Sequence, residues 1–177
     1  RSTLFPYTTL FRSRTGETES HGFLEVVFQS KNRLITPEDD NFGFAQWAYD
    51  NLEQLTEAFG PGKHFGEWFG PGIQKNPLGI DEKRFYLFNA VHWFFKFDDV
   101  ADALPGNVDV VPVLAVGDDF VTAVRDAELY LRETGSFVRG AQGKAAEGYI
   151  VYHSATRQRF KVLLENDDIS KTEAGLK

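Results

Sequence analysis

The sequence predicts an α+β fold, in which several strands and two amphipathic helices build a single domain. Runs rich in aromatic and β-branched residues, such as residues 23–29 and 147–153, are typical of strands. Apolar residues recur at helical spacing over residues 44–59 and 120–131. The chain has 177 residues, of which 42% are hydrophobic and 15% aromatic, which is enough for one domain with a substantial core.

The composition excludes several classes of protein. The sequence contains no cysteine, so neither a disulfide framework nor a thiolate metal site can form. No apolar run approaches the roughly 20 residues that a membrane helix needs, and we expect a cytoplasmic protein. The net charge of −7 argues against a broad nucleic-acid surface, although a local groove on an acidic protein can be positive.

The first 13 residues do not resemble a native protein segment. Residues 3–13 (TLFPYTTLFRS) look like the in-frame translation of a sequencing adapter. We interpret residues 1–13 as an adapter-like, non-native tail and leave them out of the fold prediction, and we interpret residues 14–177 as a truncated domain that lacks its true N-terminus. The alternative is a native but irregular N-terminal arm.

The elements of the first half follow from local signals. Residues 14–21 are polar and hold Gly16, so they predict a hairpin turn, which leads into a strand at residues 23–29. Residues 30–33 (SKNR) carry two cations at the end of that strand. A helix over residues 44–59 is capped by the acids at residues 38–40 and ends at a Gly-Pro-Gly turn, residues 60–62.

Similar local signals predict the elements of the second half. Beyond the strands that hold Glu67 and Phe85, residues 91–97 continue apolar, and residues 98–102 predict a turn or short helix. Residues 108–116 predict a strand, with Pro112 at an edge or bulge. A helix begins after Asp118 and Asp119 and ends at Gly135, followed by a loop at residues 136–146. Residues 147–153 and 157–164 predict two strands joined by a short turn.

The most informative stretch is residues 65–76 (FGEWFGPGIQKN), followed by an aromatic strand at residues 84–89 (RFYLFN). Gly66 permits a close approach of another group to the backbone. Glu67 places a charge where the pattern predicts burial, which calls for a partner or a ligand. The sequence has no P-loop, no G-x-G-x-x-G fingerprint and no H-E-x-x-H helix, and its four histidines are scattered.

Four segments occur in a fixed order: the cations of residues 30–33, the Glu67 stretch, the aromatic strand and the hairpin that begins at Glu147. From about residue 23 to residue 161 this arrangement resembles the RNA ligase 2 type of phage RNA ligase. That type belongs to the covalent nucleotidyltransferase superfamily, together with DNA ligases and mRNA capping enzymes. The resemblance implies antiparallel sheets with flanking helices in an ATP-grasp-like domain, with a nucleotide cleft between the sheets.

The resemblance also implies site residues. Glu67 is expected to hold the ribose of an adenylate, and Phe88 to stack on the adenine. Glu147 is expected to bind the catalytic metal, and Lys161 to neutralise the α-phosphate. Lys31 occupies the place of an arginine that faces the adenylate in the family, with Arg33 as a near alternative. Cations on phosphate oxygens, a carboxylate on a hard divalent ion and an aromatic face against a base are what nucleotidyl transfer requires.

Two departures from the family pattern concern lysines. The family's nucleophile is the lysine of a K-x-(D/H/N)-G motif, one strand before the cations, yet residues 1–30 contain no lysine and that place lies near Phe11 and Arg12. Lys63 begins a loose K-x-x-G match, but at the wrong place in the motif order. Leu163 stands where the family has a second lysine after Lys161. The alternative for Lys161 is an exposed strand lysine without a ligand.

The resemblance therefore predicts the adenylylation domain of an ATP-dependent RNA ligase, of the kind used in RNA repair, which joins RNA 5′-phosphate and 3′-hydroxyl ends. The implied cofactors are ATP and Mg²⁺ or Mn²⁺, the partners are RNA ends, and we expect a monomer. Without the nucleophilic lysine, the chain as given is expected to fail in forming lysyl-adenylate. Two alternatives stay open: a non-catalytic module that binds nucleotide or RNA, and a DNA ligase or capping-type nucleotidyltransferase.

Overall fold

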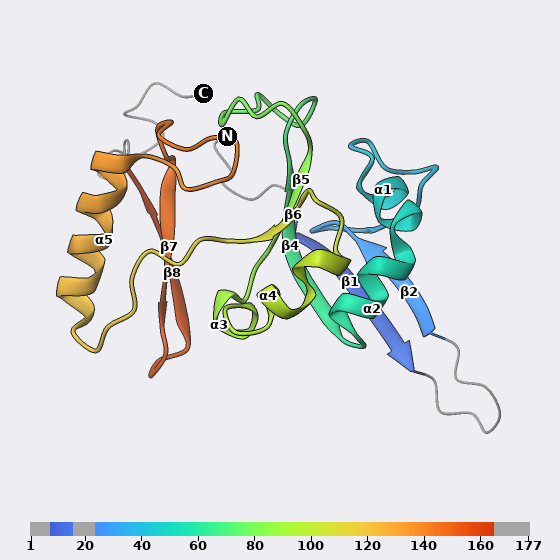
Figure 1. Cartoon of the computed structure of the whole chain (residues 1–177), viewed down its shortest axis with the longest axis horizontal. Helices are drawn as coiled ribbons and strands as arrows, with labels where there is room; N and C mark the ends of the chain where they lie inside the picture. The colour runs from blue at the N-terminus through green and yellow to red at the C-terminus, as the bar shows by residue number, and fades with distance from the viewer. Residues whose placement is uncertain (1–7, 16–23, 165–177) are drawn as a thin grey trace. The chain divides into compact units, whose positions relative to one another are not determined.

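The structure is a computed structural model that describes residues 8–15 and 24–164, and the chain divides into two compact units (Figure 1). The N-terminal unit ends at Val111, and the C-terminal unit begins at Pro112. Each unit has its own sheet with at least one helix, so the α+β class and the antiparallel sheets predicted from the sequence are confirmed.

The N-terminal unit contains a sheet of six strands in the order β3-β2-β1-β4-β5-β6. All neighbouring strands are antiparallel except β5 and β6, which are parallel. The strands are β1 (Thr8–Thr15), β2 (Leu24–Gln29), β3 (Leu34–Ile35), β4 (Lys63–Phe69), β5 (Arg84–Leu87) and β6 (Val108–Val110).

Strand β1 includes residues 8–13, which were left out of the fold prediction. It lies between β2 and β4 and pairs with both, for example Leu10 with Gln29 on one side and with Phe65 on the other. The predicted hairpin turn also starts too early, because residues 14 and 15 still belong to this strand. The rest of that turn, residues 16–21, lies outside the described residues. The non-native origin of residues 1–13 stays a prediction.

Helices α1 (Phe44–Asp50) and α2 (Leu52–Phe59) occupy the range predicted as one helix, which is interrupted at Asn51. Asp40, among the predicted caps, accepts hydrogen bonds from the backbone N–H groups of Phe42 and Ala45 at 3.0 and 2.6 Å. Gly60 ends α2 with a positive φ of 66°, as predicted.

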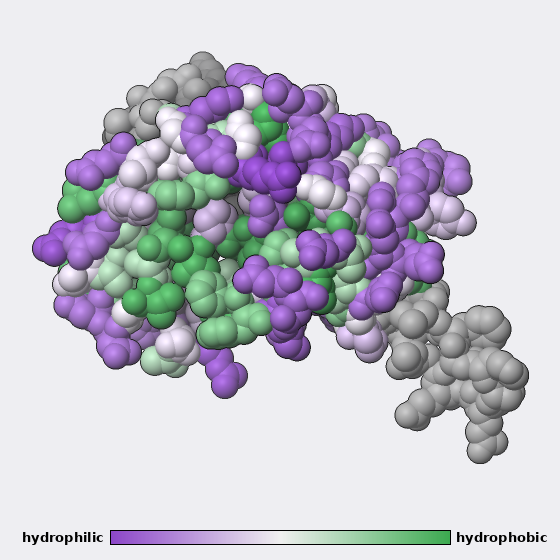
Figure 2. All heavy atoms as spheres, in the orientation of Figure 1, coloured by the Kyte–Doolittle hydropathy of each residue, from purple (hydrophilic) through white to green (hydrophobic). Residues whose placement is uncertain are grey.

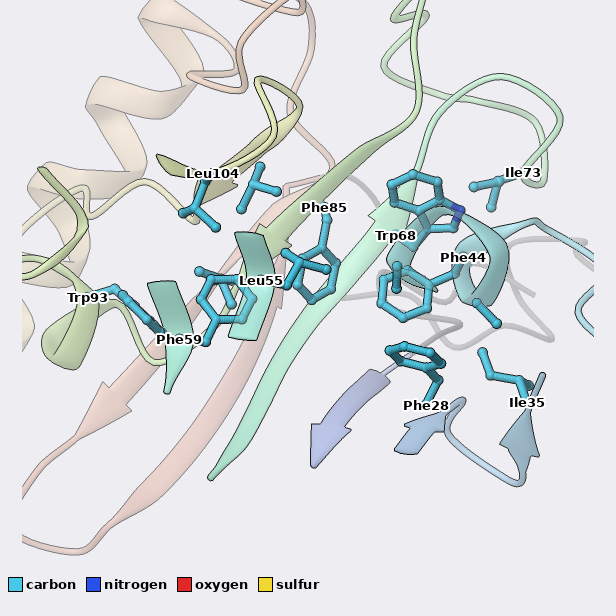
Figure 3. Packing of buried hydrophobic residues seen from close by; sticks show 14 residues of the cluster. Phe28, Ile35, Phe44, Leu55, Phe59, Trp68, Ile73, Phe85, Trp93 and Leu104 are labelled. Carbon is cyan, nitrogen blue, oxygen red and sulfur yellow. The ribbon is translucent and has the colours of Figure 1, made fainter. Parts of the chain in front are cut away.

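The predicted apolar stripe of these helices packs on one face of the sheet. Figure 3 shows Phe44 between the strand residues Phe28, Trp68 and Phe85, and its ring centroid lies 5.1 Å from that of Phe85. Trp47 stacks on Trp68 with a centroid distance of 4.8 Å. These contacts leave the opposite face of the sheet as the one that can carry polar side chains, since alternate residues of a strand point to opposite faces.

After β5 the chain forms short helices, α3 (Ala90–Trp93), α4 (Phe97–Val100) and the 3₁₀ helix η1 (Ala101–Ala103). Only Trp93 of α3 is buried, against Phe59 at a centroid distance of 5.3 Å. The strand predicted at residues 108–116 is wrong in length, because β6 ends at Val110. Pro112, which has no N–H to donate to a sheet, follows two residues later and marks the unit boundary.

The C-terminal unit consists of α5 (Phe120–Thr134) and an antiparallel hairpin, β7 (Gly148–His153) and β8 (Gln158–Leu163). The Asp119 side chain caps α5 by accepting from the Thr122 N–H, and Gly135 ends the helix, both as predicted. Tyr149 of β7 donates its hydroxyl to Glu128 of α5 at 2.8 Å. Within the described residues, no helix combines the length and apolar character that crossing a bilayer requires.

Candidate functional site

Glu67 lies in β4 on the face of the sheet that points away from the aromatic core. His64, Gly66 and Trp68 are buried, whereas the alternate residues Phe65 and Glu67 are exposed and half-buried. In the sheet register Glu67 pairs with Tyr86 of β5. The predicted mismatch of a charge within an apolar strand is therefore resolved by alternation, which directs the carboxylate to the face opposite the core.

Gly66 is glycine because the protein's own core approaches its backbone. A Cβ atom there would lie 2.5 Å from two ring carbons of Phe85 and 2.6 Å from the carbonyl oxygen of Tyr86. The predicted close approach is thus confirmed, and the approaching group is a neighbouring side chain of the same sheet. This packing brings β4 close to β5, and Glu67 projects from the opposite face of the sheet.

Phe88 follows directly after β5, and its N–H donates to the carbonyl oxygen of Phe65 at 2.7 Å. This bond continues the ladder between β4 and β5, so Phe88 falls on the same face as Tyr86 and Glu67. Glu67 and Phe88 are diagonal neighbours on adjacent strands, a relation in which Cα atoms lie about 7–8 Å apart. The structure therefore brings together the residue expected at the ribose and the residue expected at the base.

Lys31 and Arg33 lie in the exposed turn after β2. The Ser30 N–H donates to the Arg33 carbonyl oxygen at 2.8 Å, and the Arg33 guanidinium forms an ion pair with Asp39. Gln29 pairs with Leu10, which pairs with Phe65, so this turn emerges at the sheet end that holds Glu67. Two strand spacings, about 10 Å, separate β2 from β4.

Glu147 immediately precedes β7, and its carbonyl oxygen accepts the Leu164 N–H at 2.9 Å. Its Oε1 atom is buried and has no hydrogen-bond partner within the described part of the chain. Burial raises the pKa of the Glu147 carboxyl, and the positive charge of Lys161 opposes that rise. The Leu164 bond places Glu147 beside the strand that carries Lys161 three residues earlier, so both residues belong to one hairpin.

The pairing of β7 with β8 explains why residue 148 is a glycine. A Cβ atom at this position would lie 2.0 Å from the carbonyl oxygen of Val162, which no side chain could tolerate. Glycine at this position therefore lets the backbone of β8 approach β7 immediately after Glu147. The six predicted residues thus form two sets, one in each unit: Lys31, Arg33, Glu67 and Phe88 in the first, and Glu147 and Lys161 in the second.

Two residues on the Glu67 face were not identified from the sequence. Tyr86 is only 3% exposed although it lies on the face away from the aromatic core. The Arg84 side chain is 7% exposed and forms an ion pair with Glu82, while its Nε and Nη1 atoms have no hydrogen-bond partner among the described residues. Arg84 is therefore a buried cation diagonal to Glu67, and Glu82 is its ion-pair partner. In the sequence, the feature that could have identified Arg84 is its place in the aromatic strand, two residues before Tyr86.

No family model and no curated protein sequence matches the chain. Two solved structures of RNA ligase variants from Naegleria gruberi, both in the apo state, are similar in fold. One matches with a TM-score of 0.55 and 18% identity, the other with 0.51 and 19%. Each match covers 90% of this chain and 47% of the other, so the chain spans about half the length of those structures. The RNA ligase type of fold predicted from the sequence is therefore confirmed.

Proposed function

We propose that the chain is the adenylylation domain of an ATP-dependent RNA ligase. The observation that carries the proposal is the fold similarity to RNA ligase structures over nine-tenths of the chain. The shared sheet face of Glu67 and Phe88 supports it, because a carboxylate can bind ribose hydroxyls while an aromatic ring stacks on the base. Lys31 or Arg33 would face the phosphates from the same end of the sheet.

In this proposal each residue has a role toward the nucleotide. Lys161 would neutralise the α-phosphate oxygens as a point charge. In the sealing step, the RNA 3′-hydroxyl attacks the 5′-phosphate of an adenylylated RNA end. A phosphodiester bond forms, the bond to AMP breaks, AMP leaves with its electron pair, and the proton of the 3′-hydroxyl passes to water. Positioning and charge neutralisation are the main contributions that a protein makes to such transfers.

A divalent cation, Mg²⁺ or Mn²⁺, fits the residues that are present. The buried Oε1 of Glu147 lacks a hydrogen-bond partner among the described residues, and a carboxylate oxygen is the ligand type that hard cations prefer. Among the same residues, no three acidic or histidine side chains gather into a metal site. Glu147 would therefore hold the ion together with water and phosphate oxygens, and the ion would supply positive charge to the phosphate.

The chain as given is not expected to adenylylate itself, because residues 1–30 provide no lysine amine. Sealing of a pre-adenylylated RNA does not need that amine chemically. The test is therefore incubation with pre-adenylylated RNA, an acceptor strand and Mg²⁺. We expect a slow appearance of sealed product, which Glu147→Gln and Lys161→Gln each abolish.

A second arm uses labelled ATP and a denaturing gel, and no labelled protein band is expected. A labelled band would show that another residue, such as Lys63, serves as nucleophile. If neither sealing nor nucleotide binding is detected, the proposed function is wrong. If nucleotide binds without sealing, the non-catalytic binding module is the better description.

A further inference from the structure

The hairpin formed by β7 and β8 differs in charge from the rest of the chain. Residues 148–163 contain three cations, Arg157, Arg159 and Lys161, and neither aspartate nor glutamate. The whole chain has a net charge of −7. A local positive surface on an acidic protein attracts polyanions over distances of about a Debye length.

The register of the hairpin places two of these cations on one exposed face. Ile150 pairs with Lys161, and Tyr152 pairs with Arg159, so these four side chains project on the same side. All four are exposed, with Ile150 at 45% and Tyr152 at 49%. Figure 2 shows hydrophobic side chains uncovered among hydrophilic ones on the part of the surface where α5 and the hairpin lie, and both elements contribute exposed apolar residues.

The opposite face of the hairpin packs against α5 and is not available. Tyr149 is buried there and bonds to Glu128, and the ring of His153 lies 5.2 Å from that of Phe120. Arg132 of α5 also donates to the Leu164 carbonyl oxygen at 3.1 Å. These contacts fix the hairpin, so its outer face is a rigid surface.

The outer face combines the two features that single-stranded nucleic acids require. Arg159 and Lys161 are two residues apart on one strand, which spaces their Cα atoms by about 6.5 Å. The Arg159 guanidinium carbon lies 5.7 Å from the centroid of the Tyr152 ring, so cation and aromatic face are adjacent. Arg157, in the turn that precedes β8, extends the row of cations. Glu147 lies near the Lys161 end of this row, immediately before β7.

We propose that this outer face of the hairpin binds a single RNA strand, beyond the adenylate site. Arg157 and Arg159 contact phosphates of the strand, and the Tyr152 ring stacks on one base. The strand leads toward Lys161 and Glu147, where its end reacts. The inference rests on the proposed function for the identity of the polyanion, and it adds the surface and the residues that recognise it.

The test is fluorescence anisotropy of a labelled RNA of about 12 nucleotides, within the range that single-strand surfaces cover. Affinity is measured at several salt concentrations. Replacing both Arg157 and Arg159 by Gln should reduce the salt slope, log affinity against log salt concentration, by about 1.4, since each cation on a single strand contributes about 0.7. Tyr152→Leu should weaken binding about 10-fold with an unchanged slope.

The matched control is Arg125→Gln, an arginine exposed on α5 of the same unit and paired with Asp126. It should leave affinity and slope unchanged. All replaced side chains are exposed, so melting temperatures should not move. A DNA strand of the same sequence should bind similarly, because phosphate contacts and stacking do not read the 2′-hydroxyl.

The outcomes separate this inference from the proposed function. If the hairpin variants bind RNA with wild-type affinity and slope, while AMP binding is intact, the hairpin surface is wrong and the ligase proposal stands. If the variants lose RNA binding but the unsubstituted chain does not seal pre-adenylylated RNA, the surface is right and the ligase proposal fails. If an acidic peptide displaces the RNA more effectively than a nucleic acid strand does, the surface serves a protein partner and the inference is overturned.

Discussion

Replacing Gly66 by Ala separates a packing role of this glycine from a role in ligand approach. The added Cβ would lie 2.5 Å from Phe85 ring carbons, where ordinary contacts are 3.4–4 Å. The ring is among the most buried in the protein, so it must move by roughly 1 Å inside a dense core. Overpacking of this kind costs about 1–3 kcal/mol of unfolding free energy.

The assay is thermal unfolding followed by circular dichroism. For a chain of this size, the expected loss corresponds to a decrease in melting temperature of roughly 2–12 °C. Gly106→Ala is the matched control, since a Cβ there meets nothing within 4 Å and its φ is not positive. It should change the melting temperature little or raise it slightly, because alanine restricts the unfolded chain.

The reasoning would be refuted if Gly66→Ala unfolds at the wild-type temperature. If the same variant then fails to bind AMP, the glycine serves ligand approach directly. A loss of stability with AMP binding retained at low temperature supports packing. The two readouts therefore distinguish the explanations without a further structure.

Three further predictions concern titration and capping. Burial raises the pKa of the Glu147 carboxyl above its ordinary value, so the bound proton stabilises the fold, and that stability is lost as pH rises through the raised pKa. The melting temperature of Glu147→Gln should therefore increase relative to wild type as pH rises from 4 to 8, and a constant difference would contradict this. Burial lowers the pKa of His64 below 6.5, so the folded state prefers the neutral ring, and the unfolding free energy should fall as pH drops below 6.5. His64→Phe should make the unfolding free energy less dependent on pH in this range, as measured by unfolding at several pH values. Asp119→Ala removes the side chain that caps α5 and should cost about 1 kcal/mol in urea unfolding, whereas the exposed Asp118→Ala should cost little.

Local signals predicted the helices and the C-terminal hairpin well, because their period and caps lie within a few residues. The stripe from Phe44 to Phe59 is buried as expected, and Asp119 and Gly135 bound α5. Pro112 was given the role of an edge or bulge, yet it stops the strand, since it cannot donate to the ladder. Strand β1 was missed because its sequence was interpreted as foreign, and its pairing with two neighbours is a tertiary property.

The residue types of the site could be predicted from the sequence, but not which of these residues lie beside one another. Glu67 and Phe88 lie 21 positions apart, and only the register between β4 and β5 shows that they share a face. Arg84 and Tyr86 were not identified, because their burial depends on the whole unit and not on local pattern. The need for Gly66 was predicted, but the group that approaches it is Phe85, which alternation alone could not reveal.

The central claim is that Phe88 and Lys161 bind the base and the phosphate of an adenylate, and calorimetric titration with AMP and with adenosine tests it directly. Phe88→Ala should weaken the binding of both ligands, because it removes the stacking of the base. Lys161→Gln should weaken AMP and leave adenosine unchanged, because it removes a charge from the phosphate alone. If Lys161→Gln leaves AMP affinity at the wild-type value while Phe88→Ala abolishes it, Lys161 does not bind the phosphate and the account is wrong.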